Sequence, residues 1–131
     1  MSENLARLLL RLTIGGNMLL HGISKLTHGI DGIVERVVAH GLPSAFAYGV
    51  YVGEVLAPVL MIIGLATRAS AWLVAFTMVV AIWLAHAGDV FALGDHGSWA
   101  IELQSLFLFG SIAVALLGPG KWSIKNTGWL G

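Results

Sequence analysis

Four long apolar stretches alternate with short polar or glycine-containing segments along the chain. They cover about 5–24, 45–65, 69–87 and 99–117, and each is close to the roughly 20 residues that a helix needs to cross a bilayer. The second stretch contains one charged residue, Glu54, the fourth contains only Glu102, and the third contains none. The pattern predicts an all-α polytopic membrane protein, a four-transmembrane-helix bundle that forms a single domain over 1–131.

The segments between the apolar stretches predict where these helices end. Segment 64–68, Gly-Leu-Ala-Thr-Arg, predicts a tight turn between two antiparallel neighbours, and Gly118-Pro119-Gly120 predicts the end of the fourth helix. Ser44 is the expected N-cap of the second helix. Between the first two stretches, apolar residues at positions 30, 33, 34, 37 and 38 predict a short interfacial amphipathic helix.

The composition supports the membrane class and excludes several functions. Only 11% of the residues are charged, whereas soluble domains carry roughly a quarter. The chain has no cysteine, which excludes disulfides, thiolate metal sites and iron–sulfur ligation. Its seven basic and seven acidic residues give a formal net charge of zero, which argues against nucleic acid as a partner.

The distribution of basic residues predicts the orientation. With four crossings, Lys25 and Arg36 lie on one side of the membrane, and the other basic residues lie on the side of the termini: Arg7, Arg11, Arg68, Lys121 and Lys125. The positive-inside rule then places both termini in the cytoplasm.

Polar residues in the first stretch recur every four positions: Thr13, Asn17, His21 and Lys25. This spacing places them near one helical face, which we expect to point into the bundle because polar groups facing lipid are costly. Asn17 and Thr13 could also serve only to bond a neighbouring helix. In the third stretch, Trp72, Phe76 and Trp83 could form an aromatic wall beside His86 for a flat ligand, although tryptophans near helix ends are also common interface anchors.

Glu54 and Glu102 are the strongest functional signals, because an ionised carboxylate at membrane depth must be protonated, paired or hydrated. The available partners are His21, Lys25 and His86, which the predicted topology brings to the same outer end. This cluster could be an ion pair that fixes helix packing, or a site that handles protons or orients a ligand.

Several chemistries remain open for this cluster. Imidazoles and carboxylates could bind a first-row metal, but no short ligand spacing supports this. His21 and His86 could hold a haem. The chain could instead be a binding or proton-coupled transport protein, which would require an oligomer, or a structural anchor for a soluble enzyme. Nucleotide-binding loops, Ser-His-Asp signatures and zincin motifs are absent from the sequence.

A series of short motifs resembles the DoxX family of small prokaryotic membrane proteins. The matching residues run in order over nearly the whole chain: His21-Gly22-Ile23-Ser24-Lys25-Leu26, Gly41-Leu42-Pro43, Glu54, Gly64-Leu65-Ala66-Thr67-Arg68, Ala81 with His86, Glu102, and Gly118-Pro119-Gly120-Lys121-Trp122-Ser123. Lys125 departs from the pattern, because family members often have an acidic residue at this place.

The resemblance implies a four-helix bundle in the cytoplasmic membrane and a link to redox enzymes. The family is named for its similarity to a subunit of a thiosulfate:quinone oxidoreductase, and its recurring polar residues fall on His21, Lys25, Glu54, Arg68, His86 and Glu102. We therefore expect an oxidoreductase subunit with a soluble or membrane redox partner, and a quinone as its cofactor. In this hypothesis Glu54, Glu102 and His86 are catalytic, and the ligand-binding residues are His21, Lys25, Asn17, Trp83 and Arg68.

Overall fold

The computed structural model describes residues 2–85 and 101–124, and this part of the chain is helical with connecting turns. The elements are α1 (Ser2–His28), α2 (Asp31–Ala39), the 3₁₀ turn η1 (Ser44–Tyr48), α3 (Gly49–Tyr51), the π-helical turn η2 (Val52–Leu56), α4 (Ala57–Ile63), α5 (Thr67–Ala85) and α6 (Glu102–Leu117). The predicted all-α class is confirmed for the described residues.

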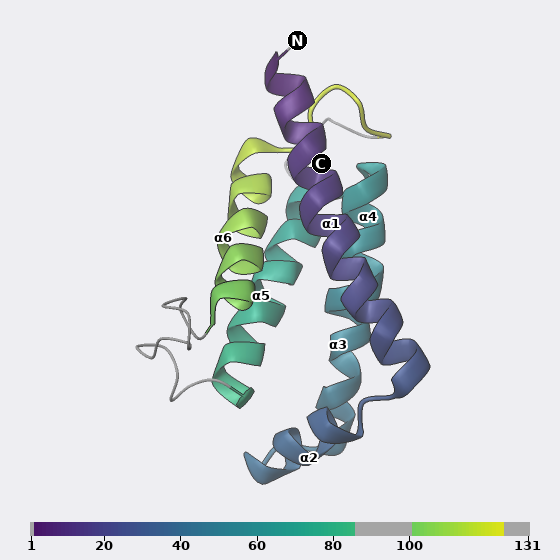
Figure 1. Ribbon diagram of the computed structural model, residues 1–131, viewed down its shortest axis with the longest axis vertical. Helices are drawn as coiled ribbons and strands as arrows, with labels where there is room; N and C mark the ends of the chain where they lie inside the picture. The colour runs from purple at the N-terminus through teal and green to yellow at the C-terminus, as the bar shows by residue number, and fades with distance from the viewer. Residues whose placement is uncertain (1, 86–100, 125–131) are drawn as a thin grey trace.

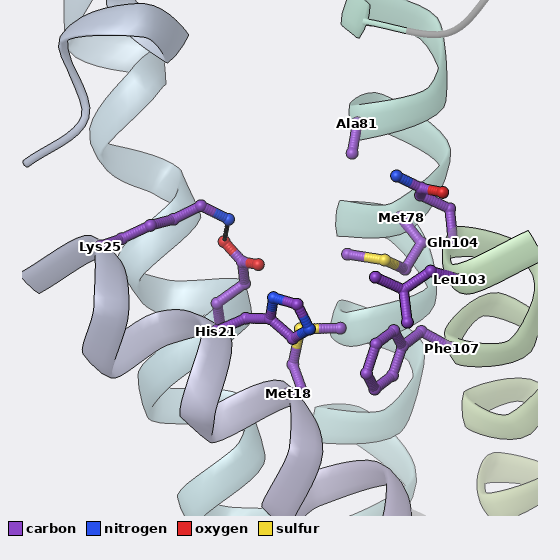
Figure 2. Close-up of a pocket in the computed structure, with 9 residues that line it drawn as sticks. Met18, His21, Lys25, Met78, Ala81, Leu103, Gln104 and Phe107 are labelled. Carbon is purple, nitrogen blue, oxygen red and sulfur yellow. Dashed lines mark hydrogen bonds and ion pairs between the residues drawn. The ribbon is translucent and has the colours of Figure 1, made fainter. Parts of the chain in front are cut away.

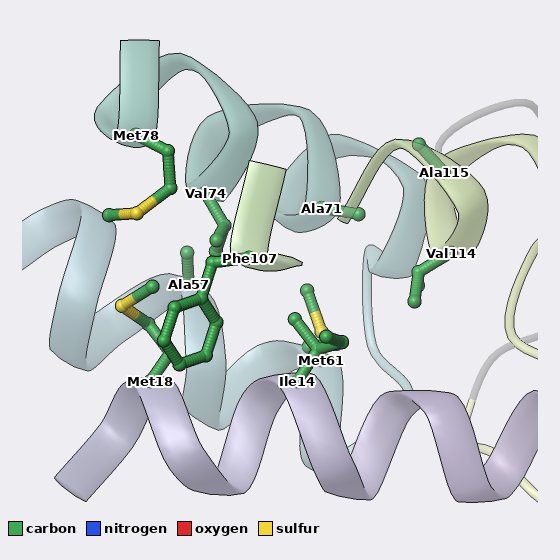
Figure 3. Packing of buried hydrophobic residues seen from close by; sticks show 10 residues of the cluster. All are labelled: Ile14, Met18, Ala57, Met61, Ala71, Val74, Met78, Phe107, Val114 and Ala115. Carbon is green, nitrogen blue, oxygen red and sulfur yellow. The ribbon is translucent and has the colours of Figure 1, made fainter. Parts of the chain in front are cut away.

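The long helices form an elongated bundle, and α2 lies across one of its ends (Figure 1). Helix α1 packs on α4, η2 and α6, while α5 packs on α6 and α4. Between them lies an apolar core to which every long helix contributes, as Figure 3 shows: Ile14, Met18, Ala57, Met61, Ala71, Val74, Met78, Phe107, Val114 and Ala115. A second, smaller cluster around Ile30, Val37 and Ala47 joins α2 to η1.

Two helical runs of the described residues are long and apolar enough to cross a membrane, namely Ser44–Ile63 with 20 residues and Thr67–Leu84 with 18. Segment Leu103–Leu117 is apolar but shorter, and α1 is long but carries Glu3, Arg7, Arg11 and Lys25. A bundle with four crossings therefore stays a prediction.

Several predicted helix boundaries are confirmed. The amphipathic segment forms α2, and α6 ends at Leu117, directly before Gly118. Gly64 ends α4 with a left-handed backbone (φ 79°), and α5 starts three residues later. The expected N-cap at Ser44 is wrong. Ser44 lies inside η1, where Pro43 takes the cap position and no side chain caps the turn.

After α6, segment 118–124 folds back over the end of the bundle that holds the N-terminus (Figure 1). We call this segment the strap. The Lys121 amide donates to Asn4 Oδ1 at 2.9 Å, and the Ile124 amide donates to the Ile63 carbonyl at 3.2 Å. The strap is therefore attached both to the first turn of α1 and to the last residue of α4.

Buried Arg11 joins the same three elements. Its guanidinium donates to the carbonyls of Met61 (2.9 Å), Ile62 (2.8 Å), Pro119 (2.9 Å) and Trp122 (2.7 Å), and the residue is 1% exposed. The last carbonyls of a helix have no partner within the helix. Arg11 thus satisfies the C-terminus of α4 and holds the strap at the same time.

Candidate functional site

Glu54 lies in the π-helical turn η2, in the middle of the run that was predicted as one regular helix. A π turn contains one residue more than an α turn and occurs frequently at functional sites. Glu54 is 4% exposed, so its carboxylate is almost completely withdrawn from the surface. The turn therefore presents a buried acid to the interior of the bundle.

Two glycines allow the neighbouring helices to approach η2 closely. A Cβ atom at Gly22 of α1 would lie 2.1 Å from the Glu54 carbonyl oxygen, and one at Gly53 would lie 1.9 Å from Thr77 Oγ1 of α5. Such distances cannot occur between real atoms, so only glycine fits at either position. The absence of a side chain at Gly22 and Gly53 is what holds η2 tightly between α1 and α5.

Lys25 of α1 forms an ion pair with Glu54, in which Nζ donates to Oε2. The lysine side chain is 30% exposed, whereas that of the glutamate is 5% exposed. The buried carboxylate is thus compensated by a cation that still reaches the surface. The pairing compensates the cost of burying an ionised carboxylate.

The ion pair lies at one edge of a cleft with a volume of about 110 Å³, shown in Figure 2. Its walls come from α1, η2, α5 and α6: Met18, His21, Lys25, Glu54, Met78, Ala81, Leu103, Gln104 and Phe107. The thioethers of Met18 and Met78 and the ring of Phe107 make the wall opposite the ion pair apolar. The cleft therefore combines one strongly polar edge with a polarizable, apolar floor.

His21 stands between these two parts of the cleft. Its ring packs edge to face on Phe107, with the ring centroids 5.6 Å apart, and the residue is exposed. An imidazole nitrogen can donate or accept a hydrogen bond, depending on its tautomer. His21 thus provides a second polar group for a ligand that enters from the surface.

The structure brings together three of the predicted site residues, His21, Lys25 and Glu54, at the cleft. Three others do not line it: Asn17, Arg68 and Trp83. Exposed Asn17 donates from Nδ2 to the carbonyl of Thr13 in its own helix. Arg68 lies at the opposite end of the bundle, where Nη1 donates to the carbonyl of Ala115 at 3.1 Å. His86 and the side chain of Glu102 lie outside the described residues.

Trp83 does not line the cleft either. Its ring is tilted against His40, which follows α2, with the centroids 4.7 Å apart, and Trp83 is 48% exposed. His40 Nδ1 lies 2.7 Å from the carbonyl of Arg36, which fixes the orientation of the imidazole ring. In the structure, Trp83 therefore attaches α2 to α5.

We expect Trp83→Ala to loosen α2 from the bundle. An aromatic pair contributes about 0.5–1.5 kcal/mol beyond the area that it buries, so backbone amides of α2 should exchange with solvent severalfold faster. Hydrogen exchange measured by mass spectrometry checks this. Phe76→Ala is the matched control, because Phe76 lies in the same helix and is 64% exposed. Equal exchange of α2 in both variants would contradict the role of Trp83.

Sequence reasoning missed the apolar half of the cleft. Met18 lies three residues before His21, so a signal was present at helical spacing, but a methionine in an apolar helix carries no distinguishing pattern. Met78, Phe107 and Gln104 come from helices distant in sequence, and only the packing of α5 and α6 beside α1 brings them together.

The described residues bear on two of the alternative chemistries. They contain no group of three histidine, aspartate or glutamate side chains placed to hold a metal ion. The histidine pair predicted for a haem includes His86, which lies outside the described part. Within the described part, the cleft is suited to a small ligand that has a polar edge.

The comparisons with known proteins agree with the sequence-based resemblance. The DoxX family profile matches residues 6–87. The chain is 35% identical over 117 residues to the Bacillus subtilis (strain 168) protein named "Putative oxidoreductase CatD", a match that covers 89% of this chain and 82% of that protein. No solved structure gives a significant match. The profile spans more than half of the chain and includes His21, Lys25 and Glu54, and this chain belongs to the DoxX family.

Proposed function

We propose that this chain is the membrane subunit of a quinone-linked oxidoreductase system and that the cleft beside Glu54 binds the quinone. The single observation that carries the proposal is the ion pair between buried Glu54 and partly exposed Lys25 at the edge of a largely apolar cleft. The redox element comes from the family and from the name of the Bacillus relative.

The residues of the cleft match the two parts of a quinone. A carbonyl oxygen needs a hydrogen-bond donor, and the ammonium of Lys25 and the imidazole of His21 both provide one. The ring needs an apolar, polarizable surface, which Met18, Met78 and Phe107 form. The described cleft, at about 110 Å³, is smaller than the roughly 150 Å³ cavity that holds benzene in an engineered protein. It therefore fits one carbonyl edge of the ring.

A bound quinone would accept two electrons, which the partner oxidoreductase supplies, and two protons. In our proposal this chain serves the proton part of the reaction. Lys25 and His21 orient the carbonyl oxygen. Glu54 takes up a proton from the surface and passes it to the reduced oxygen, and the second proton follows by the same route after Glu54 has been protonated again. Lys25 is partly exposed and links the buried carboxylate to the surface. In the proposal, His86 and Glu102 remain catalytic residues, as predicted from the sequence, and provide a second imidazole and a second carboxyl group.

Glu54→Gln should weaken binding of a water-soluble short-chain quinone to the purified chain. The substitution keeps the shape of the side chain but leaves Lys25 without its ionic partner, so the polar edge loses its fixed geometry. A hydrogen bond to a charged group contributes about 1.5–3 kcal/mol, and we expect the dissociation constant to rise at least tenfold. Quenching of tryptophan fluorescence during a quinone titration measures it.

Glu35→Gln is the matched control, because Glu35 is an exposed acid on α2 that no wall of the cleft includes. Its dissociation constant should equal that of the wild type. Absence of quinone binding by the wild-type chain, or an equal loss in both variants, would contradict the proposal. If the chain is instead only a structural anchor for a soluble enzyme, both Glu54→Gln and Glu35→Gln should still retain that partner.

A further inference from the structure

The end of the bundle that holds the N-terminus is rich in cations and poor in acids. Arg7, Arg11, Arg68 and Lys121 lie there, and among the described residues of this end only Glu3 is acidic. The sequence from Gly118 onward contains no aspartate or glutamate at all. Among the described residues of this end, four cations are therefore opposed by a single carboxylate, that of Glu3.

The three arginines differ in what satisfies their guanidinium groups. Arg11 donates to four carbonyls, and Arg68 donates to the carbonyls of Ala115 and Leu116. Arg7 has no hydrogen bond or ion pair with any described residue, although its Nε atom is buried. Buried donors are nearly always satisfied in folded proteins, so this orphan donor indicates a partner outside the described residues.

The strap places the backbone of a second cationic residue, Lys121, beside Arg7. A Cβ atom at Gly120 would lie 3.2 Å from Arg7 Cβ, so the strap backbone packs directly on the Arg7 side chain. The next residue, Lys121, is exposed and is held in place by the bond from its amide to Asn4. Arg7 and Lys121 thus lie at neighbouring backbone positions. No described residue forms an ion pair with either of them.

The strap also exposes apolar side chains beside these cations. Trp122 is 44% exposed and Ile124 is 69% exposed. Tryptophan is enriched at the headgroup level of membranes, where its ring lies in the acyl boundary and its N–H faces water. Cations next to such residues suit the surface of a membrane, where the phosphates of the lipid headgroups lie directly above the hydrocarbon core.

We infer that Arg7 and Lys121 form a binding site for the phosphate of an anionic phospholipid headgroup, with Trp122 and Ile124 inserted beside it. The phosphate supplies acceptors to the two unpaired cations, and the acyl chains cover the two apolar side chains. The inference is independent of the quinone proposal, because the cleft lies elsewhere, along the bundle between α1, α5 and α6, and shares no residue with this site.

Native mass spectrometry of the detergent-purified full chain tests the inference, with phosphatidylglycerol and phosphatidylcholine as the probes. The wild type should retain phosphatidylglycerol severalfold more strongly than phosphatidylcholine. A basic residue near an anionic surface contributes about a fivefold gain in binding, so Arg7→Gln and Lys121→Gln should each lower phosphatidylglycerol retention about fivefold. Arg7→Lys should keep most of it.

Arg36→Gln is the matched control, because it removes one exposed cation from the opposite end of the bundle. It should leave the retention unchanged. Equal retention of both lipids by the wild type, or an equal effect of Arg36→Gln and Lys121→Gln, would overturn the inference. Displacement of the lipid by 10 mM inorganic phosphate would also overturn it, because the site would then bind free phosphate and not a lipid headgroup. If Arg7→Gln fails to fold, the exposed Lys121 carries the test alone.

Discussion

Gly22→Ala should strongly destabilise the protein and disrupt the site, although it adds only one methyl group. The new Cβ atom would lie 2.1 Å from the carbonyl oxygen of Glu54 and 2.8 Å from Val55 Cγ2. The obstacle is backbone, which cannot rotate away, so α1 and η2 must move apart. Overpacking of this kind costs about 1–3 kcal/mol, and backbone shifts raise the cost. Thermal unfolding in detergent, followed by tryptophan fluorescence, measures the loss.

Gly16→Ala is the matched control in the same helix. A Cβ atom at Gly16 meets nothing within 4 Å, and alanine in a helix interior is more favourable than glycine by about 1 kcal/mol. We therefore expect the two variants to shift the unfolding temperature in opposite directions. A wild-type unfolding temperature in Gly22→Ala would contradict the close packing of α1 on η2.

The same contact explains how the ion pair is held. Gly22 and Lys25 lie three residues apart on α1, so both face η2. Separating α1 from η2 would also pull Lys25 away from Glu54. Gly22→Ala should therefore weaken quinone binding together with stability, whereas Glu54→Gln affects binding chiefly. Comparison of the two variants therefore separates the effect of the packing of η2 on α1 from the effect of the Glu54 carboxylate.

The parts of the fold that were predictable from sequence depend on local signals. Glycines at 64 and 118 end helices, and the apolar period of residues 30–38 forms α2. The π turn at Glu54 has no such signal. It lies where Gly22 of α1 approaches the backbone of Glu54 and where Gly53 approaches the Thr77 side chain of α5, and both contacts are set by tertiary packing.

Of the predicted polar face of α1, His21 and Lys25 line the cleft, whereas Thr13 and Asn17 do not. A helix turns about 100° per residue, so a stripe repeated every four residues rotates by about 40° at each step. The buried row instead follows the true helical period through Arg11, Ile14, Gly15, Met18 and Gly22. Lys25 continues this row, whereas Thr13 and Asn17 have rotated out of it and are exposed.

The hydrogen-bond partners of Arg11 could not be predicted from the sequence either. The long side chain of an arginine near the start of an apolar stretch can extend to the lipid headgroups. Instead its guanidinium points inward, because five donors match the carbonyls that α4 and the strap leave without partners. These carbonyls belong to residues more than 45 positions away, so nothing in the neighbourhood of Arg11 could indicate them.

Arg11→Met should therefore release the strap and lower the stability of the whole bundle. Methionine keeps much of the side-chain volume but leaves four carbonyls without a donor. A buried polar group that loses its partner costs about 1–3 kcal/mol. Arg11→Lys should be intermediate, because one ammonium has three donors and no planar fork. Trypsin cleavage after exposed Lys121 reports release of the strap, and thermal unfolding reports stability. Arg36→Gln, which removes an exposed arginine from the other end, should change neither. If Arg11→Met cleaved at the wild-type rate, attachment of the strap would depend on the Asn4 and Ile63 bonds alone, and the central role of Arg11 would be refuted.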